Sequence, residues 1–188
     1  LQGSRTSHGL SGDTVVASET FEGGTAGWSN QRRHHNNYYS YFLGHWGAGE
    51  STQKTFTIDR SLVTVVEFDW YRLDSWDGET FRVWFNGQQV LQSPGFTGWA
   101  HIKDTKRGTS LGISWEMVPD VGSWGSRWGR RMWNEQSFKV TLTVPANWAS
   151  SSSLKVKVGS TLDQGRGDEA WGLDNWILRK KDPNSPCP

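Results

Sequence analysis

Alternating apolar and polar residues between Leu62 and Leu73 constrain the fold of this chain more than any other stretch of its sequence. Successive side chains of a β-strand point to opposite faces, so the alternation divides this stretch into two faces. One face carries Leu62, Thr64, Val66, Phe68 and Trp70, and the other carries Val63, Val65, Glu67, Asp69 and Tyr71. The first face is mostly apolar and the second becomes polar toward its end, which predicts a long strand that buries one face.

Shorter stretches with the same period of two recur along the chain, and none has a helical period or an internal repeat. The dipeptide Asn86-Gly87 is typical of a two-residue hairpin turn, whereas the polar run Arg32–Asn37 is expected to be a loop. The other expected strands are Val15–Glu22, one that starts at Gly27-Trp28, Tyr39–Leu43, Thr52–Ile58, Glu79–Asn86, Gln88–Gln92, Leu111–Val118, Phe138–Val144, Leu154–Val158 and one that carries Trp171, Leu173 and Ile177. About ten short strands without helices predict an all-β fold, in which two antiparallel sheets pack as a β-sandwich.

The length of 188 residues suits one domain with flexible ends. Residues 1–12, rich in Ser, Gly and His, are expected to be disordered. Residues 13–180 are expected to form the single β-sandwich domain, and the Pro-rich residues 181–188 a flexible tail. Residues 93–135 are rich in Trp, Gly and Arg, which predicts long functional loops at one end of the sandwich.

The chain begins with Leu1 rather than Met, which suggests an excised or processed piece of something longer. Cys187 is the only cysteine, so an internal disulfide is excluded. The 20 basic and 19 acidic residues give a net charge of +1, and no stretch approaches the ~18 apolar residues of a membrane span. We therefore expect neither nucleic acid nor a membrane as a partner.

Two acidic clusters suggest a metal site. Asp74, Asp77 and Glu79 follow the longest apolar strand, and Glu169 and Asp174 lie near the end of the chain. Carboxylates are hard oxygen ligands, which Ca²⁺ takes in groups of about six to eight. These residues are therefore candidate ligands of structural Ca²⁺, although a solvated turn with Asp77-Gly78 at its tip remains open.

Both ends of the chain resemble jelly-roll carbohydrate-binding modules and MAM-type extracellular domains. The resemblance rests on Phe21-Glu22-Gly23-Gly24 to Trp28 and on Gly172-Leu173-Asp174-Asn175. It implies that the first and last strands pair and that Glu22 and Asp174 hold a structural Ca²⁺ side by side. The segment from Phe68 to Gly87 is also similar to concanavalin-like and adhesin-type sandwich domains of secreted proteins, which implies an extracellular or cell-wall location.

Laminarinase-like glycoside hydrolases share this sandwich and carry Glu-x-Asp-x-Glu on one strand. The corresponding residues here are Glu67, Asp69 and Tyr71, so the second catalytic Glu is replaced. Hydrolysis by that route needs two carboxylates that flank the scissile bond. We therefore expect a binding module rather than an enzyme.

The 13 tryptophans exceed the usual need of a core of this size, so several are expected at a ligand-binding surface. The candidate ligand-binding residues are Trp84, Trp99, Trp124, Arg127, Trp128, Arg130, Arg131 and Trp133. Flat rings can stack on sugar rings while Arg and Asn bind hydroxyl groups, which favours polysaccharide or glycan as the partner. The alternatives are an adhesin domain that binds a peptide or protein, an anionic polymer bound by Arg, and a purely structural Trp lid.

The chain is further expected to be a monomeric domain of a larger protein. Two adjacent histidines, His34 and His35, are not expected to bind a metal, because no Cys or second His pair lies near them in the sequence.

Overall fold

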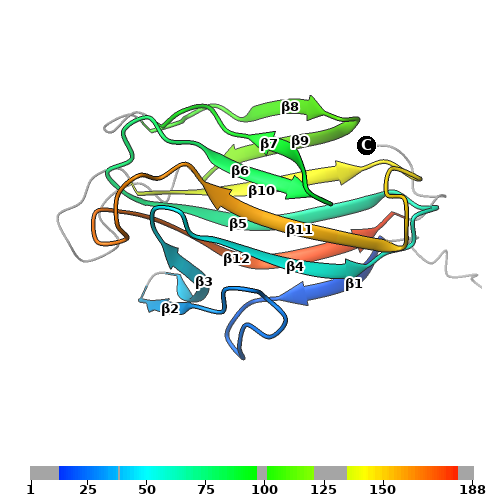
Figure 1. Cartoon of the computed structure of the whole chain (residues 1–188), viewed down its shortest axis with the longest axis horizontal. Helices are drawn as coiled ribbons and strands as arrows, with labels where there is room; N and C mark the ends of the chain where they lie inside the picture. Colours follow the sequence, from blue (N-terminus) through cyan, green and yellow to red (C-terminus); the bar gives the residue numbers. More distant parts are fainter. Residues whose placement is uncertain (1–12, 38, 97–100, 121–134, 182–188) are drawn as a thin grey trace, which may run out of the picture.

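Twelve β-strands and no helix make up the part of the chain that the computed structural model describes, residues 13–37, 39–96, 101–120 and 135–181 (Figure 1). None of these residues therefore belongs to a helix long and apolar enough to cross a membrane. The larger sheet contains β1 (Thr14–Glu19), β2 (Arg33–Asn36), β3 (Ser40–Trp46), β5 (Thr64–Asp74), β8 (Lys106–Ser110), β9 (Ile113–Pro119), β10 (Gln136–Val144) and β12 (Glu169–Lys180). The smaller sheet contains β4 (Ser51–Thr57), β6 (Phe81–Phe85), β7 (Gln88–Gln92) and β11 (Ser153–Ser160).

The two sheets have the strand order of a jelly roll. The larger sheet runs β2-β3-β12-β5-β10-β9-β8, with β1 paired to β12, and the smaller sheet runs β4-β11-β6-β7. Strands that follow one another in the chain alternate between the sheets from β3 to β6 and again from β10 to β12 (Figure 1). All pairings are antiparallel among the described strands, which confirms the predicted two-sheet sandwich.

The predicted long strand is confirmed as β5, together with its two faces. Val66, Phe68 and Trp70 are fully buried between the sheets, whereas Glu67 and Asp69 are half-buried on the opposite side. The hairpin at Asn86-Gly87 is confirmed as well, with φ angles of 48° and 83°. Both residues are left-handed, as a type I′ turn requires.

Three local expectations are wrong. Residues 33–36 form a strand, β2, because a strand at the edge of a sheet can pair with β3 without an apolar face of its own. Gly27-Trp28 starts no strand, since the Trp28 N–H donates to the Thr25 carbonyl in a turn. Strand β8 was not expected, because its turn, Leu111-Gly112, has the left-handed φ angles of 53° and 80° without the usual Asn or Asp.

Tryptophan fills the core more than the composition suggested. Of the nine tryptophans in the described residues, six are buried, namely Trp28, Trp46, Trp70, Trp76, Trp171 and Trp176. Trp176 lies between the sheets, with its ring stacked on Phe56 of β4 at 5.6 Å and on Phe68 of β5 at 4.9 Å between centroids. Trp70 stacks in the same way on Phe81 of β6, at 4.5 Å. Aromatic stacking therefore joins the two sheets at both places.

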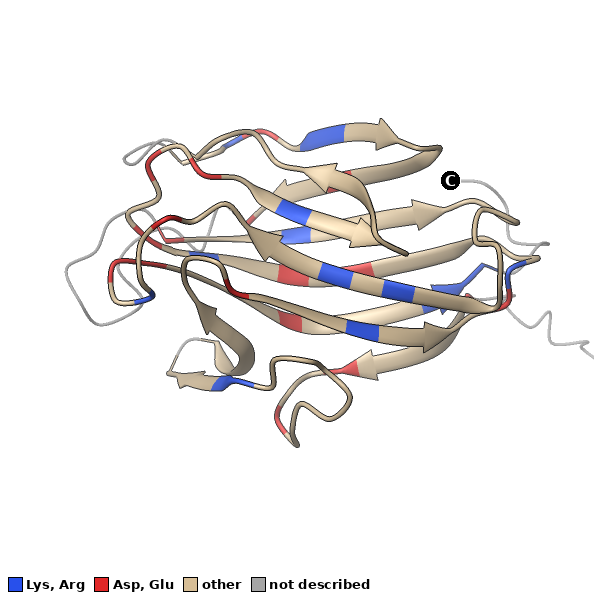
Figure 2. Cartoon of the chain, viewed as in Figure 1, with Lys and Arg blue, Asp and Glu red and all other residues tan. Residues whose placement is uncertain are grey.

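Charge is distributed unevenly over this frame. Acidic residues gather on the loops at one end of the sandwich, where β5 ends and β12 begins (Figure 2). Basic residues lie along β11 and β6 of the smaller sheet, where Lys155 and Lys157 are exposed. The acidic end is therefore the natural place to look for a cation.

Candidate functional site

The acidic corner after β5 is fastened to the segment that starts β12. The indole N–H of Trp76 donates to the carbonyl oxygens of Ala170, at 2.9 Å, and Leu73, at 3.1 Å. The Ser75 hydroxyl lies 3.3 Å from the Asp168 carbonyl, to which it donates. These bonds hold residues 73–79 against residues 168–170 although the two segments are about ninety positions apart in the sequence.

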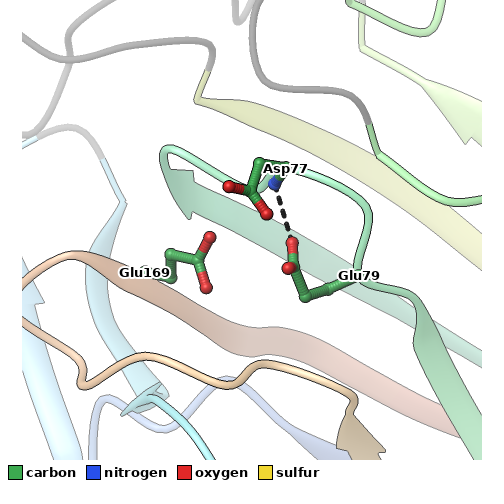
Figure 3. A group of neighbouring side chains, drawn as sticks. All are labelled: Asp77, Glu79 and Glu169. Carbon is green, nitrogen blue, oxygen red and sulfur yellow. Dashed lines mark hydrogen bonds between the residues drawn. The ribbon is translucent and has the colours of Figure 1, made fainter.

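Three carboxylates converge at this junction. The ligand oxygens of Asp77, Glu79 and Glu169 lie within 4.8 Å of one another (Figure 3). Glu79 is held in place, because one of its carboxylate oxygens accepts the N–H groups of Asp77, at 2.7 Å, and Gly78, at 3.1 Å. Asp77 is exposed, and Glu79 is almost completely buried. Among the described residues this is the one group of three or more acids, histidines or cysteines with such spacing.

Glu169 has the least ordinary environment of the three. Its side chain is 0% exposed, and neither of its carboxylate oxygens has a hydrogen-bond partner among the described residues. Burial, together with the neighbouring charges of Glu79 and Asp77, raises the pKa of Glu169 to about 7. An unpaired buried carboxylate is costly, so this arrangement suits a bound cation.

The other predicted metal ligands lie elsewhere. Asp74 is the strand partner of Glu169, but its carboxylate is not part of the group of three. Glu22 is exposed and accepts the Ser40 hydroxyl and, at 3.1 Å, the Tyr41 N–H. The Ser40 hydrogen bond lowers the pKa of Glu22. Of the six predicted ligands, the structure therefore brings three together.

Asp174 is buried in the larger sheet beside its strand partner Asp69. It accepts the Tyr71 hydroxyl at 3.2 Å and the Asn175 N–H at 2.7 Å. Burial raises the pKa of Asp174 to about 7, and the charges of Asp69 and Glu22 contribute. The expected pairing of the first and last strands is confirmed, since β1 pairs with β12. A cation shared by Glu22 and Asp174 stays a prediction.

Asp174→Asn is expected to raise the melting temperature at pH 8 in EDTA and to change it little at pH 4. The folded-state pKa of about 7 lies above the unfolded value, so the wild-type chain loses stability as the pH rises from about 4 to 7. This loss is at most about 1.4 kcal/mol for each pH unit. Asn cannot ionise, so the Asp174→Asn variant does not lose this stability as the pH rises. Melting curves at both pH values test this, and an equal shift at pH 4 and pH 8 would contradict it.

A pocket of about 540 Å³ opens at the same end of the sandwich. It is built by β2, β3, the end of β5 and the loop before β12, and it is lined by His34, His35, Asn36, Asn37, His45, Leu73, Asp74, Arg166, Gly167 and Ala170. The Ala48 N–H donates to the Gln164 carbonyl at 2.8 Å, which ties the Arg166 loop to the turn after β3. The lining combines imidazole, amide, carboxylate and guanidinium groups with two apolar side chains, as small-ligand pockets commonly do.

Two of these lining residues have a backbone that L-amino acids rarely adopt. The φ angles of His45 and Asp74 are 65° and 68°. Such conformations are concentrated at binding and catalytic sites, because the surrounding fold must impose them. Burial, and then the charges of His34 and Arg166, lower the pKa of His45 to about 4. The ring of His45 is therefore neutral at pH 7, and it lies 4.8 Å from that of His34 between centroids.

Of the ligand-binding residues predicted from the sequence, Trp84 is the one in the described part of the chain, and it does not line this pocket. Trp84 is half-buried on β6 and faces outward as expected, with the Lys157 ammonium 5.1 Å from its ring centroid. The other predicted residues lie outside the described ranges, namely Trp99, Trp124, Arg127, Trp128, Arg130, Arg131 and Trp133. The pocket was missed because its residues come from four separate segments. Three of its lining residues, His34, His35 and Asp74, were considered in the sequence only as metal ligands.

The face that raised the glycosidase alternative is occupied by paired side chains. Glu67 accepts the Arg179 guanidinium at 3.0 Å, and Asp69 accepts the Asn175 amide at 2.8 Å. Tyr71 stands where those enzymes carry a second Glu, and its hydroxyl donates to Asp174. Each of these three groups thus has a defined structural partner.

No protein-family model and no curated protein sequence matches the chain. Several solved structures are similar to it at low identity. Dimeric latent PorU from Porphyromonas gingivalis has a TM-score of 0.48 and 12% identity over 96% of this chain, which spans 14% of the length of PorU. The C-terminal CBM6 of LamC, a laminarinase from Zobellia galactanivorans, has a TM-score of 0.41 and 14% identity, and the match covers 88% of this chain and 98% of that one. The carbohydrate-binding module CBM6cm-2 from Cellvibrio mixtus lichenase 5A, in complex with cellotriose, has a TM-score of 0.38 and 13% identity, with 91% and 100% covered.

Proposed function

We propose that this chain is a non-catalytic recognition module that binds glycan outside the cell, on a sandwich frame stabilised by calcium. The observation that carries the proposal is the pocket at the acidic end, where imidazole, amide, carboxylate and guanidinium groups from four segments converge. Sugars present many hydroxyl groups, each of which can donate and accept, and this mixture of side chains offers both kinds of partner.

The charges of the pocket favour a neutral sugar over a polyanion. The negative charge of Asp74 and the positive charge of Arg166 cancel in the net charge of the pocket. The lowered pKa of His45 keeps its imidazole neutral at physiological pH. An anionic polymer would be better served by several cationic groups, since guanidinium forks pair with sulfate or carboxylate. The pocket therefore favours a neutral oligosaccharide, and its rigid, strained walls suit recognition without large rearrangement.

Two variants test the pocket by different means. Arg166→Ala removes an exposed donor, and His45→Asn removes the imidazole while keeping a residue that tolerates a left-handed backbone. Each is expected to lower binding on an array of neutral glycans at least about tenfold, the effect of losing about 1.4 kcal/mol of binding free energy. The matched control is Arg60→Ala, an exposed arginine before the start of β5, at its opposite end from Asp74.

The same array distinguishes the alternatives. Loss of binding in Trp84→Ala with full binding in Arg166→Ala would move the ligand site to the outward face of the smaller sheet. Retention of peptides alone would identify the domain as an adhesin module. Release of reducing sugar that disappears in Glu67→Gln would contradict the non-catalytic proposal.

For the wild-type chain, binding is expected to stay constant from pH 8 to pH 5 as far as His45 is concerned, because its pKa lies near 4.

A further inference from the structure

We propose that Asp77, Glu79 and Glu169 form a binding site for one Ca²⁺ ion, which joins the corner after β5 to the start of β12. The site gives the calcium of the proposed function a defined place, but it rests on its own geometry and stands whether or not the pocket binds glycan. Two independent observations support it. The first is the convergence of three carboxylates within 4.8 Å, and the second is the orphaned, fully buried Glu169 side chain that faces the other two.

The three side chains differ in how firmly the protein holds their carboxylate oxygens. Glu169 offers both carboxylate oxygens, since neither is used in a hydrogen bond among the described residues. One oxygen of Glu79 accepts two backbone N–H groups, which leaves its other oxygen available to a cation between the three side chains (Figure 3). Asp77 is exposed and can close the site from solvent. Three carboxylates supply up to five free oxygens, and water at the exposed side can complete the six to eight that Ca²⁺ takes.

The chemistry of the donors selects among metals. The group contains only carboxylates, whereas Zn²⁺ sites are usually built from Cys and His. Mg²⁺ dehydrates reluctantly and is usually held by one or two carboxylates with several waters. A site with three carboxylates, one of them fully buried, therefore favours Ca²⁺, whose larger and more flexible shell accepts bidentate binding.

The ion would act on the frame next to the pocket. Glu169 is the strand partner of Asp74, and the neighbouring Ala170 accepts the Trp76 indole hydrogen bond. Both Asp74 and Ala170 line the pocket. Neutralising the repulsion among the three carboxylates is expected to hold this wall in the conformation described here, so calcium and glycan binding should be coupled.

The direct test is metal binding by the whole chain after treatment with chelator. Isothermal titration with Ca²⁺ alone measures the affinity, and terbium, a luminescent substitute for Ca²⁺, reports proximity to the indole of Trp76, which directly precedes Asp77. Wild-type protein is expected to bind one ion at this site. Glu169→Gln is expected to weaken binding more than about 100-fold and to abolish the Trp-sensitised terbium signal, since the loss even of supporting groups typically costs 10–100-fold.

The matched control is Asp168→Asn, which removes an exposed charge next to Glu169 but outside the group. It is expected to change the calcium affinity less than about fivefold. Glu169→Gln should melt in EDTA at or above the wild-type temperature, because it removes an unpaired buried charge. Ca²⁺ should raise the melting temperature of the wild-type chain and of Asp168→Asn, but not that of Glu169→Gln. This melt also shows that the variant is folded.

Unchanged calcium affinity in folded Glu169→Gln, or no calcium binding by the wild-type chain, would overturn the site. Equal affinity for Mg²⁺ would overturn the choice of ion. None of these readouts depends on a glycan, so the site and the proposed function can fail separately.

Discussion

Trp176→Ala is expected to lower the free energy of unfolding by about 3–5 kcal/mol, the range for truncating a fully buried Trp or Phe to Ala. Trp176 is 0% exposed, and its ring stacks on Phe56 and Phe68 at interplanar angles of 7° and 9°. It also meets the edge of Trp28 at 5.2 Å between centroids. The substitution thus removes contacts that connect β12 to both sheets and leaves a cavity that rigid aromatic neighbours cannot fill.

Denaturant titration with Trp176→Phe as control separates ring stacking from the indole N–H. That N–H is buried without an acceptor in the described part of the chain, so phenylalanine loses no hydrogen bond. The control is expected to retain most of the stability. A loss below about 1 kcal/mol in Trp176→Ala would show that the aromatic stack does not hold the sheets together, since typical core truncations exceed that value.

Gly44→Ala is expected to destabilise the fold by about 3 kcal/mol or more. A Cβ on Gly44 would lie 2.6 Å from the Gly172 Cα and 2.9 Å from the Trp171 carbonyl oxygen, both of which belong to the backbone of β12. Overpacking costs about 1–3 kcal/mol. The φ of 142° adds about 1–3 kcal/mol for a residue with a side chain. Backbone atoms cannot rotate away, so the β3–β12 pairing has to open.

Gly24→Ala is the matched control for the backbone conformation, because Gly24 has a φ of 146° with nothing within 4 Å of the added Cβ. It is expected to cost only about 1–3 kcal/mol, the penalty of the backbone conformation without the close contact. Thermal or denaturant unfolding of both variants measures the difference. Equal losses of unfolding free energy in the two variants would mean that the close approach of β3 and β12 does not contribute to the effect of Gly44→Ala. Because Gly44 precedes His45, binding at the pocket should weaken with it.

The strands with the clearest alternation could be predicted from the sequence. In β6, in the middle of β5 and along most of β10, buried and more exposed residues alternate because one face packs on the opposite sheet, so the period of two is visible in the sequence. The edge strands β2 and β8 lack that constraint, and their polar residues resemble loops. The final strand was harder to interpret, since a bulge at Asn175, with a φ of 49°, shifts its register after Asp174.

The candidate sites show a similar division. Carboxylate chemistry predicted Asp77, Glu79 and Glu169 as candidate metal ligands, but the selection of these three from six depends on the register that places Glu169 opposite Asp74. The register of β12 against β5 cannot be deduced from the sequence alone. The pocket depends on two residues with left-handed backbone, His45 and Asp74. Neither is a glycine, so the local sequence did not predict their backbone conformation. Burial of Trp28 and Trp176 shows that much of the tryptophan in the described residues serves the core, whereas a ligand surface at Trp99 and in residues 124–133 stays a prediction.

The position of β12 bears on how the chain reaches this fold. This strand comes last among the twelve described, yet it lies inside the larger sheet and pairs with β1, β3 and β5. During synthesis, the edges of β1, β3 and β5 that pair with β12 stay unpaired until residues 169–180 have left the ribosome. Pairing over such long sequence separations slows folding, and open strand edges favour association with other chains. A nascent chain that ends before Glu169 would therefore depend on chaperones.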